Sequence, residues 1–426
     1  MEKLYNIING GINMKLYEEL EWRGFIKDVS DEALAKKLLN EDKITFYCGF
    51  DPTADSLTVG HLVQIIRILL LQKYGHKPIV LVGGATGLIG DPKESGERKL
   101  LTLDESLKNA EKLKVLLSKY IDSNDAIMVN NYDWISKINV IEFLRDYGKN
   151  FSINYMLAKD SVTSRLESGI SYTEFSYMIL QAIDFMYLYK NYNCRLQFGG
   201  SDQWGNITAG LELIRKTIND KDDILGISSN LLMKSDGTKF GKSEKGALWL
   251  NKELTSPYTL YQYFVNTTDS DVVQYLKSLT LLEPDKIIEL EDSVKSEPHL
   301  RKAQKELAKE IVVFLHGNKE YENALKITEA LFSGNILDLS KEELEDAFKD
   351  AESFIVEDEN ILDVLVNNNV VASKREAREF ISNGALYLNG KKIDNEELIL
   401  NKSNTLYDKY YVFRKGKKYY YLGIIK

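Results

Sequence analysis

Two segments far apart in the sequence carry residues suited to holding a nucleotide. Residues 51–61 lie between an apolar run at 44–50 and a segment at 62–71 whose apolar spacing is helical. A strand, a tight turn and a helix N-terminus in this order form a natural anion site, because the first N–H groups of a helix are free to bind a ligand. Residues 239–243 add two lysines and a flexible glycine. Each segment alone is common in proteins, but together they indicate a bound nucleotide.

Four longer motifs narrow this interpretation. They are YCGFDPTA at 47–54, GLIGDP at 87–92, YMILQAID at 177–184 and QFGGSDQWGN at 197–206. The two nucleotide segments resemble the HIGH and KMSKS signatures of class I aminoacyl-tRNA synthetases, and the four motifs, in this order, are similar to the bacterial tyrosyl-tRNA synthetase family. The resemblance extends from about Met14 to the C-terminus. It implies an enzyme that activates L-tyrosine with ATP and Mg2+ to tyrosyl-adenylate plus pyrophosphate, and then transfers tyrosine to the 3'-terminal adenosine of tRNA(Tyr).

The chemistry of this activation agrees with the residues present. The amino-acid carboxylate is already an ionised nucleophile at neutral pH, so the protein has to position two substrates and neutralise the leaving pyrophosphate. With only four histidines in the chain, a Ser-His-Asp hydrolase is a poor alternative. The resemblance implies catalytic roles for Thr53, His61, Lys239, Lys242 and Arg98, with His61 near the ribose and the other four near the phosphates. It implies contacts with ATP for Cys48, Gly49, Asp51, Thr53, Thr58, Gly60, His61, Gly200, Asp202, Lys239, Lys242 and Ser243.

The roles of Thr58 and Cys48 each allow a second interpretation. Thr58 stands where the first histidine of the HIGH signature is expected, and its hydroxyl is a shorter donor that cannot carry a charge. We expect activation to persist with this threonine. Cys48 follows Tyr47 in the first strand, and a lone cysteine there is most often a small buried residue. The resemblance implies that its thiol lies against the ATP ribose.

Tyr177, Gln181 and Asp184 are spaced by four and three residues, which places them on one face of a helix. An amphipathic helix often has such residues on its solvated face. Their chemistry favours a tyrosine pocket instead, because Asp184 can accept a hydrogen bond from a phenol while the other two hold an ammonium group. By resemblance, the complete tyrosine site comprises Tyr47, Asp91, Tyr177, Gln181, Asp184 and Gln203.

Two other functions remain open from the sequence. A related synthetase for tryptophan would share the fold, but an indole offers no hydroxyl to Asp184. A catalytically inactive RNA-binding scaffold is the other alternative. Lys239, Lys242, Asp91 and Asp184 argue against it, and Thr58 is the only residue in its favour.

The composition predicts a multidomain protein with a basic C-terminal module. The 426 residues suffice for two or three domains, and the net charge is -9. Residues 361–426 nevertheless hold 12 Lys and Arg against 7 Asp and Glu.

The two cysteines, Cys48 and Cys194, are too few for a metal knuckle or a disulfide framework, which favours the cytoplasm. We expect no secretory leader and no membrane span, because no run of 18 apolar residues occurs.

Alternating helix and strand patterns predict a Rossmann-like, doubly wound α/β catalytic domain. Helical patterns occupy 16–25, 62–74 and 103–119, and strand patterns occupy 44–50, 78–83, 126–129 and 195–198. We expect an N-terminal extension at 1–13, the catalytic domain at 14–250 with a helical insertion at 134–192, an α-helical anticodon-side domain at 251–340, an acidic linker at 341–358 and an S4-like RNA-binding domain at 359–426. The resemblance implies a homodimer whose contact lies in the insertion.

The last domain has a clear local pattern. Ser373 and Glu376 form a capping-box pattern, and Asn389-Gly390 predicts a hairpin turn. A solvated helix face is the alternative explanation for the basic residues on this helix. Beside a synthetase body we expect them to bind tRNA; they are Lys374, Arg375 and Arg378.

Overall fold

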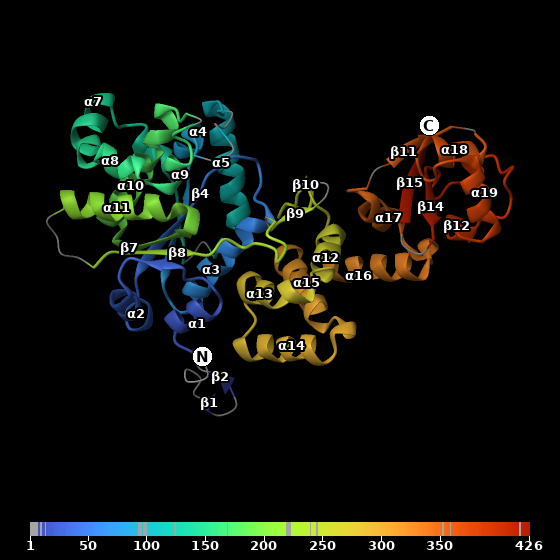
Figure 1. The fold of residues 1–426 in the computed structure, drawn as a ribbon, viewed down its shortest axis with the longest axis horizontal. Helices are drawn as coiled ribbons and strands as arrows, with labels where there is room; N and C mark the ends of the chain where they lie inside the picture. The colour runs from blue at the N-terminus through green and yellow to red at the C-terminus, as the bar shows by residue number, and fades with distance from the viewer. Residues whose placement is uncertain are drawn as a thin grey trace. The chain divides into compact units, whose positions relative to one another are not determined.

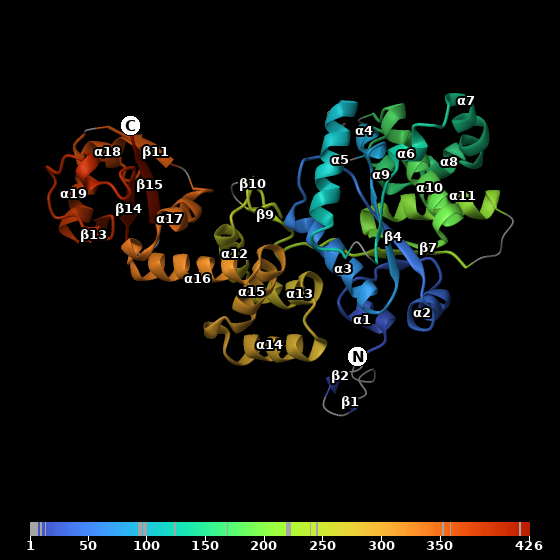
Figure 2. The same ribbon diagram turned by 180° about the vertical axis from the view of Figure 1, so that it is seen from behind.

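The computed structural model describes residues 7–8, 11–12, 14–92, 96, 100–122, 125–167, 169–218, 223–238, 240–243, 246–351, 353–357, 359–416 and 419–426. The chain forms two compact units (Figures 1 and 2). Residues 1–251 and 267–303 make up the first, and residues 252–266 and 304–426 make up the second. Within the described residues, no helix combines the length and the apolar character needed to cross a bilayer.

A six-stranded sheet forms the centre of the first unit. Its strands lie in the order β3-β8-β7-β4-β5-β6, and all neighbours are parallel except β3 and β8. Their bounds are β3 (Asp28–Val29), β4 (Thr45–Phe50), β5 (Lys77–Val82), β6 (Ile127–Asn130), β7 (Cys194–Gly200) and β8 (Leu225–Ser229). The inner strands are apolar runs because helices cover both faces of a parallel sheet. The predicted doubly wound parallel sheet is confirmed, with one antiparallel edge strand added.

Helices cover the two faces of this sheet. In Figures 1 and 2, α10 (Tyr172–Tyr192) and α11 (Trp204–Thr217) lie on one side of β7 and β8, and α1 (Leu16–Trp22), α2 (Glu32–Asn40) and α3 (Leu62–Lys73) lie on the other. Helix α10 begins at the cap residue Ser171, whose side chain accepts from the Glu174 N–H, and ends at Asn193 in the left-handed conformation (φ 52°). Residues next to the helix in the sequence therefore define both ends of α10, the helix that carries Tyr177, Gln181 and Asp184.

The rest of the first unit is mostly helical. Helices α4 (Thr86–Ile89) and α5 (Leu103–Leu117) follow β5, and the predicted insertion contains α6 (Tyr132–Ile135), α7 (Val140–Glu142), α8 (Ile153–Leu157) and α9 (Asp160–Thr163). Short strand pairs are formed by β1 (Ile7–Ile8) with β2 (Gly11–Ile12), and by β9 (Lys242–Ser243) with β10 (Gly246–Ala247). Helices α13 (Asp269–Leu279) and α14 (Pro284–Ser296) complete this unit.

The second unit contains a five-stranded sheet with apolar clusters on both faces. The strand order is β11-β15-β14-β12-β13, and their bounds are β11 (Ser353–Val356), β12 (Leu386–Leu388), β13 (Lys391–Lys392), β14 (Tyr410–Lys415) and β15 (Tyr419–Ile425). Tyr411 and Phe413 pack on one face with α18 (Ile361–Asn367) and α19 (Lys374–Ser382), whereas Tyr410 and Val412 pack on the other with α16 (Asn318–Ser333) and α17 (Lys341–Phe348). This alternation follows the pleat of β14. The unit also contains α12 (Pro257–Val265) and most of α15 (Lys302–His316).

The local predictions for the C-terminal module agree with the structure. The Ser373 side chain accepts from the Glu376 N–H at 3.2 Å. Asn389 and Gly390 both have positive φ, 49° and 79°, as the hairpin turn between β12 and β13 requires. The stretch 341–358 differs from the expected linker, since it contains α17 and β11. Leu344 and Phe348 are buried, so its acidic residues lie on a packed helix.

Candidate active site

A cavity of about 530 Å³ lies at the carboxyl ends of the central strands. The chain passes from β4 through α3 to β5 on one side of β4, and later returns on the other side as β7. This reversal of strand order creates a crevice beyond the strand ends, which is the usual ligand site of open α/β sheets. The cavity is lined by residues of β4 and β7, the turn before α3, one face of α10, and the segment after β8.

Asp184 lies almost fully buried in the cavity wall, 2% exposed, and its carboxylate is held from behind. Asn131 Nδ2 donates to Oδ2 at 2.9 Å, and Trp134 Nε1 donates to Oδ1 at 2.8 Å. Burial raises the pKa of Asp184 to about 7, although these two hydrogen bonds oppose the shift. The side chain is therefore fixed in position, with free lone pairs for a further donor.

Tyr47 presents a polar group without a partner. Its hydroxyl is buried and has no hydrogen-bond partner within the described part of the chain. Burial and the nearby Asp184 raise the pKa of Tyr47 well above its usual value. A buried hydroxyl without a partner carries a desolvation cost that a bound polar group would remove. The pair Tyr47 and Asp184 thus matches a ligand that ends in a hydroxyl.

Asp91 is the centre of a second polar cluster in the cavity. Gln203 Nε2 donates to its Oδ2 at 2.7 Å, and Asn206 Nδ2 donates to its Oδ1 at 3.1 Å. The same Asn206 amide donates to Gln181 Oε1 at 3.1 Å. Burial raises the pKa of Asp91 to about 6. A carboxylate beside two amides can accept from an ammonium group.

Tyr177 connects these clusters to the turn after β4. Its hydroxyl donates to Asp51 Oδ2 at 2.7 Å, and Thr86 Oγ1 donates to Asp51 Oδ1 at 2.7 Å. Burial and Asp51 raise the pKa of the Tyr177 phenol well above its usual value. The three residues of α10 predicted from spacing all line the cavity: Tyr177, Gln181 and Asp184.

Thr58 makes its contacts with His61. The Thr58 backbone N–H donates to His61 Nδ1 at 3.2 Å, and Thr58 Oγ1 lies 3.0 Å from the same nitrogen. Because Nδ1 accepts from an N–H, the proton of the neutral imidazole is on Nε2. Desolvation lowers the pKa of His61, which also favours this neutral form. The threonine therefore holds the histidine as an Nε2 donor.

The second signature segment contacts this turn directly. Gly241 has φ 81°, and a Cβ built on it would lie 3.1 Å from Val59 Cγ2 and 3.3 Å from the Gly60 nitrogen. The chain beyond β10 pairs with the same turn, since the Val59 N–H donates to the Leu248 carbonyl at 2.9 Å. Glycine is required at this position because of both the positive φ and the close approach. Gly241 of this segment therefore lies beside Val59 and Gly60.

Of the residues predicted to contact ATP, Gly49, Asp51, Thr53, Thr58, Gly60, His61, Gly200 and Asp202 line the cavity. Cys48 is absent from the lining: its thiol is buried, and the Arg67 Nη2 lies 3.9 Å from its Sγ. Arg98 and Lys239 lie outside the described residues, as do the side chains of Lys242 and Ser243. The predicted roles in binding ATP and in catalysis remain predictions for all of these residues.

Several residues of the site were absent from the sequence predictions. Asn131 and Trp134 hold Asp184, Thr86 holds Asp51, and Asn206 joins Asp91 to Gln181. Asn131 directly follows β6, and this position at the carboxyl end of a parallel strand was the signal that could have indicated a site residue. Arg67 is a charge inside the apolar helix α3, and it donates to Ser229 Oγ at 2.8 Å. Such an interruption of an apolar face also signals a buried polar contact.

Comparison with known families agrees with this fold and cavity. The family described as "tRNA synthetases class I (W and Y)" matches residues 39–333. The C-terminally truncated mitochondrial tyrosyl-tRNA synthetase of Aspergillus nidulans has a similar structure, with a TM-score of 0.67 and 32% identity over 75% of this chain and 95% of that one. The fold and the site together define a class I aminoacyl-tRNA synthetase.

More similar sequences give the particular family. A tyrosine-tRNA ligase of Onion yellows phytoplasma (strain OY-M) is 53% identical over 95% of this chain and 98% of its own length. One of Bacillus velezensis is 52% identical over 96% and 99%. The family described as "Tyrosine--tRNA ligase SYY-like C-terminal domain" matches residues 343–423. The chain belongs to the tyrosine-tRNA ligase family.

Proposed function

We propose that the cavity carries out tyrosine activation, with Tyr47 and Asp184 binding the phenol of the amino acid. The chain is a tyrosine-tRNA ligase: it joins L-tyrosine to ATP as tyrosyl-adenylate, releases pyrophosphate, and transfers tyrosine to the 3'-terminal adenosine of tRNA(Tyr). The observation that carries the tyrosine site is the buried pair formed by the unpartnered Tyr47 hydroxyl and the Asp184 carboxylate. The Tyr47 hydroxyl donates to the substrate phenol, and the carboxylate accepts from it.

The opposite side of the tyrosine site holds the amino group. Asp91 and Gln181, joined through Asn206, face the ammonium, and Gln203 contributes its amide oxygen. Tyr177 shapes this end and fixes Asp51. With both ends of the amino acid held, its carboxylate is oriented for attack on the α-phosphate, and orientation of this kind lowers the barrier without a general base.

ATP is bound by the turn before α3 and by the segment after β7. Thr53 and His61 donate to the nucleotide, with the His61 proton on Nε2 because of Thr58. Lys239, Lys242 and Arg98 neutralise the pyrophosphate as it leaves. Mg2+ enters with the ATP phosphates, since this small cation is usually bound by phosphates and few carboxylates.

Exchange of labelled pyrophosphate into ATP tests this proposal. Tyrosine, phenylalanine and tryptophan are offered separately to the purified protein. We expect exchange with tyrosine alone, because only a phenol satisfies both Tyr47 and Asp184. Exchange with tryptophan in place of tyrosine would overturn the assigned pocket, and exchange with none would favour an RNA-binding scaffold.

The affinity for tyrosine is expected to fall as the pH is lowered. Tyrosine binds the ionised forms of Asp184 and Asp91, whose pKa values without ligand are about 7 and about 6. Protons therefore compete with the amino acid below these values, and the dissociation constant should rise about 20-fold between about pH 8 and pH 6 and more steeply below. Titration of intrinsic fluorescence at several pH values measures this. Asp184→Asn should keep only the lower transition, and a constant affinity down to about pH 5 would contradict the assignment.

The C-terminal domain is proposed to bind tRNA as an S4-like module. The basic side chains of α19 are exposed, and two of them form surface ion pairs: Lys374 with Asp363, and Arg378 Nε with Glu396 Oε2 at 2.7 Å. Exposed pairs contribute little to stability, so both cations are free to exchange a carboxylate for a phosphate. Arg375 is exposed on the same helix. These contacts support the predicted tRNA roles of all three residues.

A homodimer through the insertion is supported by its exposed apolar residues. They gather between α7 and the start of α10, and they are Val140, Ile141, Leu144, Ile153, Leu166 and Tyr172. Exposed apolar residues mark an interface where they form a patch, and we propose that this stretch of the insertion forms one. Two cysteines, both free and buried, fit the proposed cytoplasmic location.

The dimer is tested by placing a charge in this group of residues. Val140→Asp is expected to shift the protein from dimer to monomer in sedimentation velocity, because a carboxylate would be buried at the interface. Val115→Asp is the matched control, since Val115 is similarly exposed, 56% against 67%, but lies on α5 outside the insertion. A Val140→Asp protein that sediments as the unmodified dimer does would contradict the proposed contact.

A further inference from the structure

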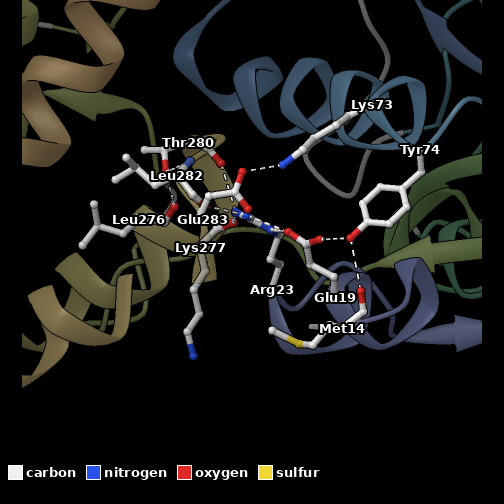
Figure 3. Close-up of polar contacts among 10 residues, drawn as sticks. All are labelled: Met14, Glu19, Arg23, Lys73, Tyr74, Leu276, Lys277, Thr280, Leu282 and Glu283. Carbon is white, nitrogen blue, oxygen red and sulfur yellow. Dashed lines mark hydrogen bonds and ion pairs between the residues drawn. The ribbon is translucent and has the colours of Figure 1, made fainter. Parts of the chain in front are cut away.

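Arg23 is a buried arginine far from the cavity that holds the end of a helix. It follows α1, is 1% exposed, and lies against the C-terminal end of α13 (Figure 3). Its Nη1 donates to the carbonyls of Lys277 and Thr280, both at 3.0 Å, and its Nη2 donates to the Leu282 carbonyl at 2.7 Å. The last carbonyls of a helix lack partners within the helix and carry partial negative charge, so a guanidinium is well suited to bind them.

Glu19 and Tyr74 fix this arginine in turn. Arg23 Nε donates to Glu19 Oε1 at 2.8 Å, and Tyr74 Oη donates to Glu19 Oε2 at 2.7 Å (Figure 3). Tyr74 is the cap residue at the end of α3, the helix that begins directly after His61. A buried ion pair is stabilising only when its remaining hydrogen-bonding positions are satisfied, as they are in this cluster. The cluster thus joins α1, α3 and the end of α13 through charge-assisted hydrogen bonds.

The other end of α13 contacts the segment that leads to the second signature. The Ser235 N–H donates to Asp271 Oδ1 at 2.9 Å, and Ser235 Oγ lies 3.0 Å from Ser270 Oγ. One residue before Gly241, the ring of Phe240 packs edge-on against Tyr275 of α13, with ring centroids 4.8 Å apart. Residues of α13 therefore contact both Ser235 and Phe240.

We propose that Arg23 is a positioning residue for tyrosyl-adenylate formation: by holding the end of α13 against α1 and α3, it sets where this helix places Phe240 and Gly241, which stand between Lys239 and Lys242 in the sequence, beside Val59 and Gly60. A helix moves as a nearly rigid element, so a fixed C-terminal end also fixes the residues at its N-terminal end. Neither Arg23 nor Glu19 lines the cavity. The inference rests on the role proposed above for the two lysines.

Arg23→Lys tests the proposal, because lysine keeps the charge but loses the forked geometry that reaches three carbonyls. We expect the single-turnover rate of adenylate formation to fall by about 10- to 100-fold, as for a small misplacement of catalytic groups. The dissociation constant of tyrosine should change less than twofold, since the residues that bind it lie on other elements. Lys73→Met is the control: its exposed pair with Glu283 borders the same cluster, and it should behave as the unmodified protein.

Two further measurements separate positioning from general loss of stability. Asp271→Ala removes the contact at the other end of α13, and in a double-mutant cycle we expect the rates to be non-additive, with the double variant little slower than the slower single variant. Hydrogen exchange at the Ser235 amide should be several-fold faster in Arg23→Lys and unchanged in Lys73→Met. Exchange needs no catalytic activity, so this measurement tests the positioning even if the proposed roles of the lysines fail.

Three results would overturn the inference. They are a normal rate in Arg23→Lys, a loss of tyrosine affinity as large as the loss of rate, and fully additive effects of the two substitutions.

Discussion

Replacing Asp184 with asparagine is expected to lower kcat/KM for tyrosine in pyrophosphate exchange by about 10- to 100-fold, the usual effect of losing a buried hydrogen bond to a charged group. The carboxylate accepts from Asn131 and Trp134 through different oxygens. An asparagine has one acceptor oxygen, so its amide would face one of these two donors. The substrate phenol would lose its charged acceptor, and a buried donor behind it would lose its partner.

The activity of the Asp184→Asn variant with phenylalanine serves as the comparison. Phenylalanine has no hydroxyl that could bind Asp184, so the substitution should reduce the preference for tyrosine over phenylalanine. Asp223→Asn is the control for the change in charge, because Asp223 is exposed and forms a surface ion pair with Lys37. An Asp184→Asn protein with unchanged kcat/KM for tyrosine would show that the phenol binds elsewhere.

The residues predicted to contact the substrates mostly line the cavity, whereas the residues that hold them in place were not predicted from the sequence. Helical spacing alone placed Tyr177, Gln181 and Asp184 on one face, and all three line the cavity. Asn131 and Trp134 lie some 50 residues before the aspartate that they hold. No local pattern connects residues at such separation, because only the packing of β6 and α10 in the folded sheet brings them together. A support residue becomes visible when the fold is known.

The distinction between local patterns and contacts distant in sequence also explains where the predicted fold differs from the observed one. The apolar runs of β4 and β5 are strong local signals because these strands are buried on both faces. The two-residue strand β3 has no such pattern, and its pairing with β8 depends on residues about 200 positions away. The acidic composition of residues 341–358 favoured a linker. The buried residues of α17, Leu344 and Phe348, nevertheless follow helical spacing. A count of residue types does not detect such spacing.

Replacing Gly241 with alanine is expected to lower kcat for adenylate formation by about 100-fold while leaving tyrosine binding unchanged. The new Cβ would lie 3.3 Å from the Gly60 nitrogen, which is tighter than usual contacts, so the chain at position 241 would have to move away from Val59 and Gly60. A displacement of about 1 Å in groups that act on the transition state has an effect of this size. Single-turnover kinetics and equilibrium binding of tyrosine separate the two quantities.

Gly237→Ala is the matched control, and it separates contact from backbone strain. Gly237 has the same φ of 81°, but no heavy atom of the described residues lies within 4 Å of a Cβ built there. Both alanines carry the strain of a positive φ, about 1–2 kcal/mol. Only the one at 241 also meets the turn that holds His61. If both variants lost the same rate, the loss would come from loop strain alone; if only Gly241→Ala is slow, the close approach of the two signatures is what the reaction requires.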